Sequence, residues 1–169
     1  MQPWQDVGGS DRWPTGHLGW VFTGSAEFEG RIGSFLAEGA ARHERLMVVA
    51  DDPSPHLWPR ALLDRGALVV ASTAEVYGPD RTVDPIAQRI TFEDAVAQAT
   101  SSGFTGIRVA ADNTSLTLGV ERLAAWVRWE DEADHLMQVL PITGLCAFDR
   151  TRVDAETLAA VEDAHRIGV

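Results

Sequence analysis

Acidic side chains follow the apolar runs of this sequence, at the points where a predicted strand passes into a turn. Asp51 and Asp52 follow one run, Glu75 another, Asp112 a third and Asp149 the last. Paired carboxylates can act as general acid and base, and they can also hold a divalent cation. Taken singly, acidic residues at such points are ordinary turn and helix-cap residues. The acidic residues at the ends of the predicted strands therefore indicate either a functional site or a set of turn and helix-cap residues.

Arg108 is a charged residue inside a predicted strand, between Ile107 and Val109. A buried guanidinium needs a carboxylate or several carbonyl groups as partners. We expect Glu130, in the helix that follows, or Asp112, at the end of the same strand, to be that partner. Two interpretations stay open, because Arg108 can form a fixed internal ion pair or can anchor a ligand.

Aromatic residues are frequent, with six tryptophans in 169 residues. Trp126 and Trp129 are three residues apart on a predicted helix, where they can fill the core or wall an apolar pocket. Trp4 and Trp13 lie in a segment rich in Gly, Pro and Asp. Such large apolar rings favour packing of this segment on the body of the protein or on a second subunit.

The first strand-to-helix turn, from Phe22 to Gly30, lacks the pattern of a phosphate-binding loop. It has neither GxxxxGK[ST] nor GxGxxG, and it contains two glutamates. All 14 basic residues of the chain are arginine, so lysine-dependent chemistry is excluded as well. A GxSxG nucleophile elbow is also absent from the sequence. We therefore assign no catalytic residue, expect no cofactor, and leave open whether the protein is an enzyme.

Metal ligands of recognisable spacing are not apparent in the sequence. The five histidines, at positions 17, 43, 56, 135 and 165, are scattered, and Cys146 is the single cysteine. Asp131 and His135 are one helical turn apart, a spacing typical of a surface pair. Cys146 lies in an apolar run, where a free cysteine is typically a small hydrophobe. We predict no metal site.

The charge of the chain argues against a nucleic-acid partner. The 25 acidic and 14 basic residues give a formal net charge of −11, whereas phosphate backbones are bound by clustered cations. One cysteine cannot form an internal disulfide, and neither a signal peptide nor a membrane-spanning apolar run is visible. We expect a cytoplasmic protein with no membrane partner.

The elements expected from the hydrophobic pattern alternate regularly along the chain. We expect residues 1–15 to form an N-terminal arm and residues 16–169 to form one domain. Within it, we expect helices between and after strands at 17–22, 46–50, 67–71, 105–110 and 141–148. Ser25 is the expected cap of the first helix, Gly39 its end, and 72–80 a loop. The predicted fold class is three-layer α/β, with a mostly parallel five-stranded sheet and helices on both faces.

From His17 to its end, the chain resembles the MEDS domain, the methanogen and methylotroph sensory domain of prokaryotic regulators. The matching pieces, in order, are the strand opened by His17, FLAEGAARHERLMVVA (35–50), the LLxxGxLxV pattern (62–70), EVY (75–77), GFxGxRV with a following Asp (103–112), Trp129-Glu130, LCAFD (145–149) and a closing AHRI (164–167). Their order and spacing carry the resemblance more than any single motif. The sequence departs from the family pattern at Leu116 and Phe148, where Trp and Tyr are usual, and at Arg166, where Pro is usual.

The resemblance implies a RecA-like fold that has lost its phosphate loop and a sensory or regulatory role. We predict a non-catalytic domain that binds a small apolar or weakly polar molecule, or a regulatory protein, at the carboxyl end of the sheet. The predicted ligand-binding residues are Arg108, Asp112, Glu130, Tyr77 and Trp129. Two alternatives stay open: an enzyme that uses Asp112, Asp51 or Glu75 as acid or base, and a homodimeric or partner-binding adaptor anchored by Trp4 and Trp13.

Overall fold

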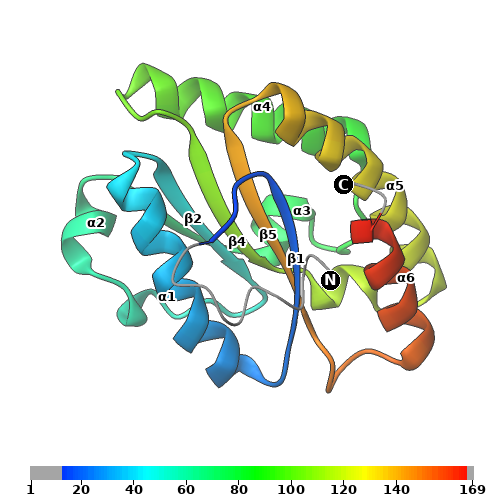
Figure 1. The fold of residues 1–169 in the computed structure, drawn as a ribbon. Coiled ribbons are helices and arrows are strands. Elements are labelled where there is room, and N and C mark those ends of the chain that lie inside the picture. The colour runs from blue at the N-terminus through cyan, green and yellow to red at the C-terminus, as the bar shows by residue number, and fades with distance from the viewer. Residues whose placement is uncertain (1–12, 167–169) are drawn as a thin grey trace.

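The structure is a computed structural model that describes residues 13–166, in which strands and helices alternate along the chain (Figure 1). The elements are β1 (His17–Phe22), α1 (Ser25–Ala41), β2 (Arg45–Ala50), η2 (Pro55–Leu57), α2 (Arg60–Asp64), β3 (Leu68–Ser72), α3 (Thr73–Tyr77), α4 (Pro85–Ser101), β4 (Ile107–Asp112), η3 (Thr114–Thr117), α5 (Val120–Val139), β5 (Ile142–Asp149) and α6 (Ala155–Arg166).

The strands of the described residues form one five-stranded sheet in the order β1-β5-β4-β2-β3, and every pairing is parallel. After β2, the chain adds β3 on one side of that strand and then returns to add β4 on its other side. The carboxyl ends of β2 and β4 are therefore a topological switch point, where connections leave in opposite directions.

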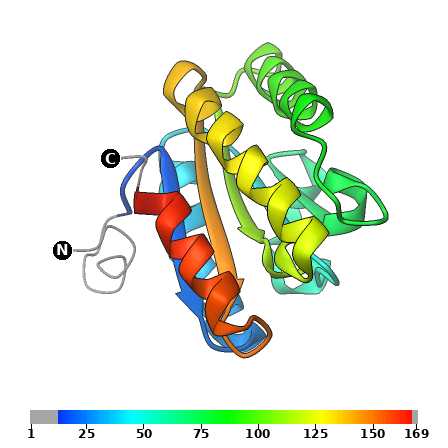
Figure 2. The same ribbon diagram turned by 90° about the vertical axis from the view of Figure 1, so that its right-hand side faces the viewer.

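Helices cover both faces of this sheet, which confirms the predicted three-layer α/β class. Figures 1 and 2 show α1 and α2 on one face, and α4, α5 and α6 on the other. Each face has its own apolar core: Phe22, Phe28 and Phe35 belong to the core beneath α1, whereas Trp126 and Phe148 belong to the core beneath α4 to α6. The strand β4 contributes to both cores, because successive side chains of a strand point to opposite faces.

Several predicted element ends were wrong. Ser25 is the first residue of α1 rather than its cap, since Gly24 takes the cap position with a φ of 77° and no side-chain hydrogen bond. Helix α1 continues past Gly39 to Ala41. The expected loop at 72–80 contains α3, which Ser72 and Glu75 begin with reciprocal hydrogen bonds between side chain and backbone.

The described end of the N-terminal arm packs on the domain body. Trp13 is buried, its ring meets Phe35 edge-on at 5.3 Å, and its indole N–H donates to Ser34 Oγ at 2.9 Å. Trp4 lies outside the described residues. Between residues 13 and 166, no helix combines the length and the apolar character needed to cross a bilayer.

Candidate functional site

A pocket of about 300 Å³ opens at the carboxyl ends of β2 and β4, and we call it the switch-point pocket. Its lining comes from the end of β2, the segment after it, the start of α1, the end of β4 and Arg152. Ligands of parallel α/β proteins bind at this place in the fold, because the diverging connections leave a crevice there. The pocket is also of the size that suits a small organic molecule.

The polar lining of this pocket is acidic, and its walls are apolar. Four carboxylates face one guanidinium, and Phe28, Val48, Leu57 and Trp58 supply apolar surface; the charged groups are Glu29, Asp51, Asp52, Asp112 and Arg152. Such a lining repels phosphate and favours a cation or a hydrogen-bond donor. The carboxylates that follow β2 and β4 therefore lie together in one pocket.

Asp51 is fixed within the pocket by three hydrogen bonds. It accepts from Ser115 Oγ at 2.6 Å and from the guanidinium groups of Arg81 at 3.1 Å and Arg152 at 3.3 Å. Burial alone would raise the pKa of Asp51, but these hydrogen bonds outweigh it and hold the pKa below its ordinary value. Asp51 is therefore a preorganised anion.

Asp112, at the end of β4, is held more loosely. Its Oδ1 accepts from the backbone N–H of Thr114 at 3.0 Å and from Thr114 Oγ1 at 2.5 Å. Burial raises the pKa of Asp112 in spite of these hydrogen bonds. Burial therefore disfavours the charged form of Asp112, and a bound hydrogen-bond donor would compensate it.

The remaining acidic residues after strands act as caps and turns. Glu75 belongs to the capping box of α3. Asp149 accepts hydrogen bonds from the backbone N–H groups of Gly24 and Thr151, which ties the turn after β1 to the turn after β5. Neither lines the switch-point pocket.

Arg108 pairs with neither Glu130 nor Asp112, so this prediction was wrong. Its Nε donates to Glu44 Oε2 at 2.6 Å, and its guanidinium lies over the ring of Phe35 at 4.8 Å. Arg108 points toward α1, whereas Glu130 lies on α5, on the opposite face of the sheet. Asp112 is on the same strand, but four residues place it about 13 Å away.

Tyr77 and Trp129 are buried in the core beneath α4 to α6 rather than in the switch-point pocket. Trp129 stacks on Phe92, with ring centroids 5.8 Å apart. Burial, together with the nearby Cys146 and Glu130, raises the pKa of Tyr77 well above its ordinary value. Of the five predicted ligand-binding residues, only Asp112 lines this pocket. The ligand roles of all five stay predictions.

Glu130 belongs to a second group of polar residues, buried within that same core. His17 at the start of β1, Cys146 in β5 and His165 in α6 surround its carboxylate, and we call these four residues the His-Glu-Cys-His cluster. Glu130 Oε2 lies 3.0 Å from His17 Nε2 and 3.3 Å from His165 Nε2. Cys146 Sγ lies 3.4 Å from His17 Nε2 and 3.8 Å from Glu130 Oε1.

Mutual charge stabilisation keeps one ion pair inside this cluster. Burial opposes the imidazolium of His17, but the attraction of Glu130 outweighs it and holds the pKa of His17 well above its ordinary value. The same attraction holds the pKa of Glu130 down against its own burial. Burial raises the pKa of Cys146 and lowers that of His165, so both are neutral beside the ion pair.

The sequence alone does not reveal this cluster, because its four residues come from four different elements across almost the whole chain. Local ligand spacing of the kind expected for zinc motifs cannot reveal such a set. The one available signal was that His17, Glu130, Cys146 and His165 all lie within the pieces that carry the family resemblance. Asp131 and His135, the pair with helical spacing, are both exposed.

Fold and pocket together define a three-layer α/β domain with a pocket of about 300 Å³ at its switch point. Residues 16–166 match the protein family described as MEDS, the methanogen/methylotroph, DcmR sensory domain. The chain therefore belongs to the MEDS family, as the resemblance indicated. No curated protein matches the chain. The two departures at Leu116 and Phe148 are both fully buried, and neither lines the switch-point pocket.

Proposed function

We propose that this protein is a non-catalytic sensory domain that binds a small molecule in the switch-point pocket. The observation that carries the proposal is the acidic, half-apolar pocket between β2 and β4, in a member of a sensory domain family. The family supports a regulatory role, and the fold supplies a site where ligands of parallel α/β proteins bind. The signal then passes by altered association with a regulatory protein or a second copy of the chain.

The ligand class follows from the charges of the lining. Four carboxylates against one guanidinium favour a small cation or a neutral hydrogen-bond donor over an anion. Phe28 and Trp58 provide an aromatic wall, and aromatic faces attract alkylammonium groups. This sharpens the expectation of a weakly polar ligand toward small amines and alcohols, and it disfavours nucleotides.

Titration calorimetry of the purified full chain tests this function with a defined probe set. The probes are methylammonium, tetramethylammonium, methanol and a short halocarbon, with acetate and phosphate as anionic comparisons. Asp51→Asn is expected to weaken binding of the ammonium probes at least tenfold, because it removes the fixed anion. Asp131→Asn removes one exposed carboxylate from α5 and is the matched control.

Preference for acetate or phosphate over every cation and neutral probe would contradict the proposed ligand class. Ammonium binding that is unchanged in Asp51→Asn would contradict the location of the site. Absence of binding by all six probes, together with tight ligand-free binding of a protein partner, would favour the adaptor instead.

An enzymatic function is the second candidate, and one observation favours it. Burial raises the pKa of Asp112 at the edge of a pocket, and catalytic carboxyl groups often have pKa values raised in this way. Turnover distinguishes the enzymatic role from the sensory role. An enzyme converts a probe and loses that conversion in Asp112→Asn, whereas a sensory domain returns the probe unchanged. The expected cytoplasmic location stays part of the proposal.

A further inference from the structure

The four side chains of the His-Glu-Cys-His cluster present their ligand atoms to one another at distances typical of a metal coordination shell. One ligand atom from each residue lies within 4.8 Å of the others. Tetrahedral zinc with bonds of 2.0–2.3 Å places its ligand atoms about 3.3–3.7 Å apart. The four measured separations in the cluster run from 3.0 to 3.8 Å.

The hydrogen bonds within the cluster leave two of its buried polar atoms unpaired. Although both atoms lie within hydrogen-bond distance of neighbours, Glu130 Oε2 and His165 Nε2 have no partner of suitable geometry. His165 Nδ1 lies 2.8 Å from the carbonyl oxygen of Val161, and because a carbonyl only accepts, Nδ1 must carry the proton. In the neutral ring of His165, the Nε2 atom then carries a lone pair and faces an oxygen of the Glu130 carboxylate. A cation between these two acceptors removes the conflict.

Neighbouring groups orient both histidines as they do in metal sites. The Nδ1 atom of His17 lies 3.5 Å from Asp134 Oδ1, which leaves Nε2 for the cluster. The carbonyl of Val161 does the same for His165. A carboxylate or backbone carbonyl on the distal nitrogen fixes the tautomer and strengthens the ligand.

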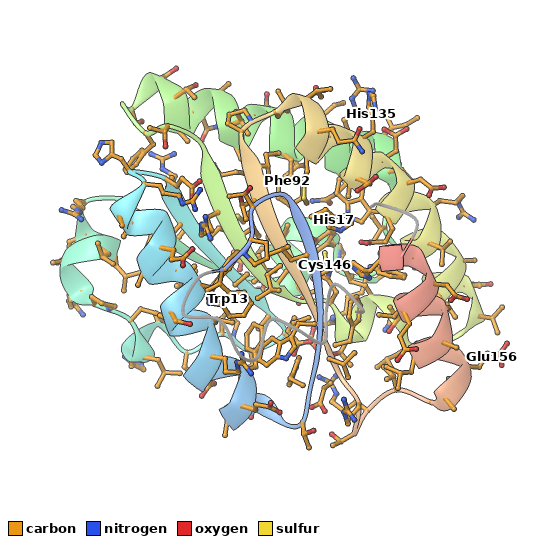
Figure 3. The ribbon with its side chains drawn as sticks, viewed as in Figure 1. Trp13, His17, Phe92, His135, Cys146 and Glu156 are labelled. Atoms are coloured by element: carbon orange, nitrogen blue, oxygen red, sulfur yellow. The ribbon has the colours of Figure 1, made fainter. Side chains whose placement is uncertain are left out.

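The backbone also makes room for this arrangement. A Cβ atom at Gly19 would lie 2.6 Å from His165 Cγ, so only glycine lets the ring of His165 approach β1. The side chains of His17, Glu130 and His165 are 8%, 2% and 4% exposed, and Cys146 is buried, so protein encloses the cluster. His135, on the same helix as Glu130, is exposed and lies at the outer edge of the molecule in Figure 3.

From this geometry we infer that His17, Glu130, Cys146 and His165 form a buried binding site for one divalent transition-metal ion of the zinc type. Two imidazoles, one thiolate and one carboxylate suit Zn²⁺ or Co²⁺ and do not suit Ca²⁺ or Mg²⁺, which prefer all-oxygen sites. Four protein ligands fill a tetrahedral shell, so the ion has no open position and holds β1, β5, α5 and α6 together.

Charge balance supports the same site. As metal ligands, two neutral imidazoles, one thiolate and one carboxylate carry two negative charges in total, because metal ligands must be deprotonated. One divalent ion neutralises these two charges, so the occupied site has no net charge to bury.

The inference goes beyond the proposed function and does not depend on it. The switch-point pocket and the cluster share no residue. Metal content and pocket binding are measured separately, so either result can fail while the other stands.

Cobalt titration of the untagged, chelator-treated full chain under reducing conditions tests the site. We expect one Co²⁺ per chain, with the d–d bands of a tetrahedral ion and a thiolate-to-cobalt charge-transfer band. Since Cys146 is the single cysteine, that band can come only from this residue. Cys146→Ser is expected to abolish the band, and His165→Gln to weaken binding at least tenfold, whereas His135→Gln binds as the unmodified chain does.

A second measurement needs no substitution and therefore covers variants that do not fold. Iodoacetamide alkylation of Cys146 in moderate urea should be at least tenfold slower with Zn²⁺ than with Mg²⁺, because a coordinated thiolate in a stabilised fold is protected. Equal alkylation rates with the two ions would overturn the inference. Substoichiometric cobalt binding without a charge-transfer band would also overturn the inference. So would unchanged cobalt binding in Cys146→Ser and His165→Gln, provided that both variants are folded.

Discussion

His165 Nε2 lies 3.3 Å from Glu130 Oε2, while Nδ1 of the same ring donates to the carbonyl oxygen of Val161. Two acceptor atoms therefore face each other in the core, although buried polar atoms are normally paired. Glu130 also binds the imidazolium of His17, so one carboxylate connects an element near the start of the domain to one near its end. The contact between His165 and Glu130 joins α6 to α5.

Gly19→Ala tests how closely α6 must approach the sheet. The new Cβ would meet the ring of His165 at 2.6 Å, so we expect a loss of about 2 kcal/mol in the free energy of unfolding, as for overpacked cores. Urea unfolding of the metal-free protein measures it. Gly30→Ala in α1 meets nothing within 4 Å and is the control, with an expected gain of about 0.5–1 kcal/mol. Equal stabilities of the two variants would show that His165 does not pack on Gly19.

Glu130→Gln removes the buried anion but preserves the shape of the side chain. Breaking a buried ion pair from one side leaves the other charge uncompensated, so we expect a destabilisation of about 3 kcal/mol in urea unfolding near neutral pH. Glu156→Gln alters an exposed glutamate of α6 and should change stability by less than about 0.5 kcal/mol. A Glu130→Gln variant as stable as its control would contradict the ion pair.

Asp112→Asn should make stability depend less on pH. The pKa of Asp112 is raised by burial, so the folded state holds this proton more tightly than the unfolded chain does. Stability contributed by the protonated form is complete below the unfolded pKa and is lost as pH rises through the folded pKa. The variant keeps an acceptor for Thr114, so it should gain stability over the unmodified chain at pH 7 and lose this advantage near pH 4. Urea midpoints at the two pH values check this, and a variant less stable at pH 7 would contradict it.

Glu44→Gln separates a structural role of Arg108 from a ligand role. The guanidinium of Arg108 is fully buried and its Nη2 atom has no hydrogen-bond partner, so loss of the Glu44 anion should cost about 3 kcal/mol. Binding of ammonium probes should not change, because neither residue lines the switch-point pocket. Weakened probe binding in a folded Glu44→Gln protein would support the original expectation that Arg108 anchors a ligand.

The hydrophobic pattern was sufficient for the fold class, because β2 and β3 contain the continuous apolar runs that a doubly covered parallel strand requires. It misplaced local ends where proline and polar residues decide the geometry: Pro55 and Pro59 divide one expected helix into η2 and α2, and Ser72 begins α3 inside an expected loop. The predicted relation to RecA-like ATPases concerns ancestry and stays a prediction.

The candidate site was predicted only in part. Asp51 and Asp112 follow adjacent parallel strands, so sequence order and sheet geometry together bring them to one edge. Arg108 and Glu130 were expected to meet because a buried guanidinium needs a carboxylate partner and Glu130 lies in the helix that follows. Strand alternation places them on opposite faces of the sheet, and the partner of Arg108 comes from Glu44, just before β2. Contacts between distant elements depend on the strand order, which the pattern alone does not determine.

The sensory account is tested most directly by an amide and indole NMR titration of the full chain with tetramethylammonium, with acetate as the comparison. Trp58 is the tryptophan among the described residues that lines the switch-point pocket. The account predicts saturable shifts of the Trp58 indole N–H and of the Asp51 and Asp52 amides with the cation, and none with acetate. Saturable shifts confined to residues outside the pocket, or no saturable shift with the cation, would contradict it.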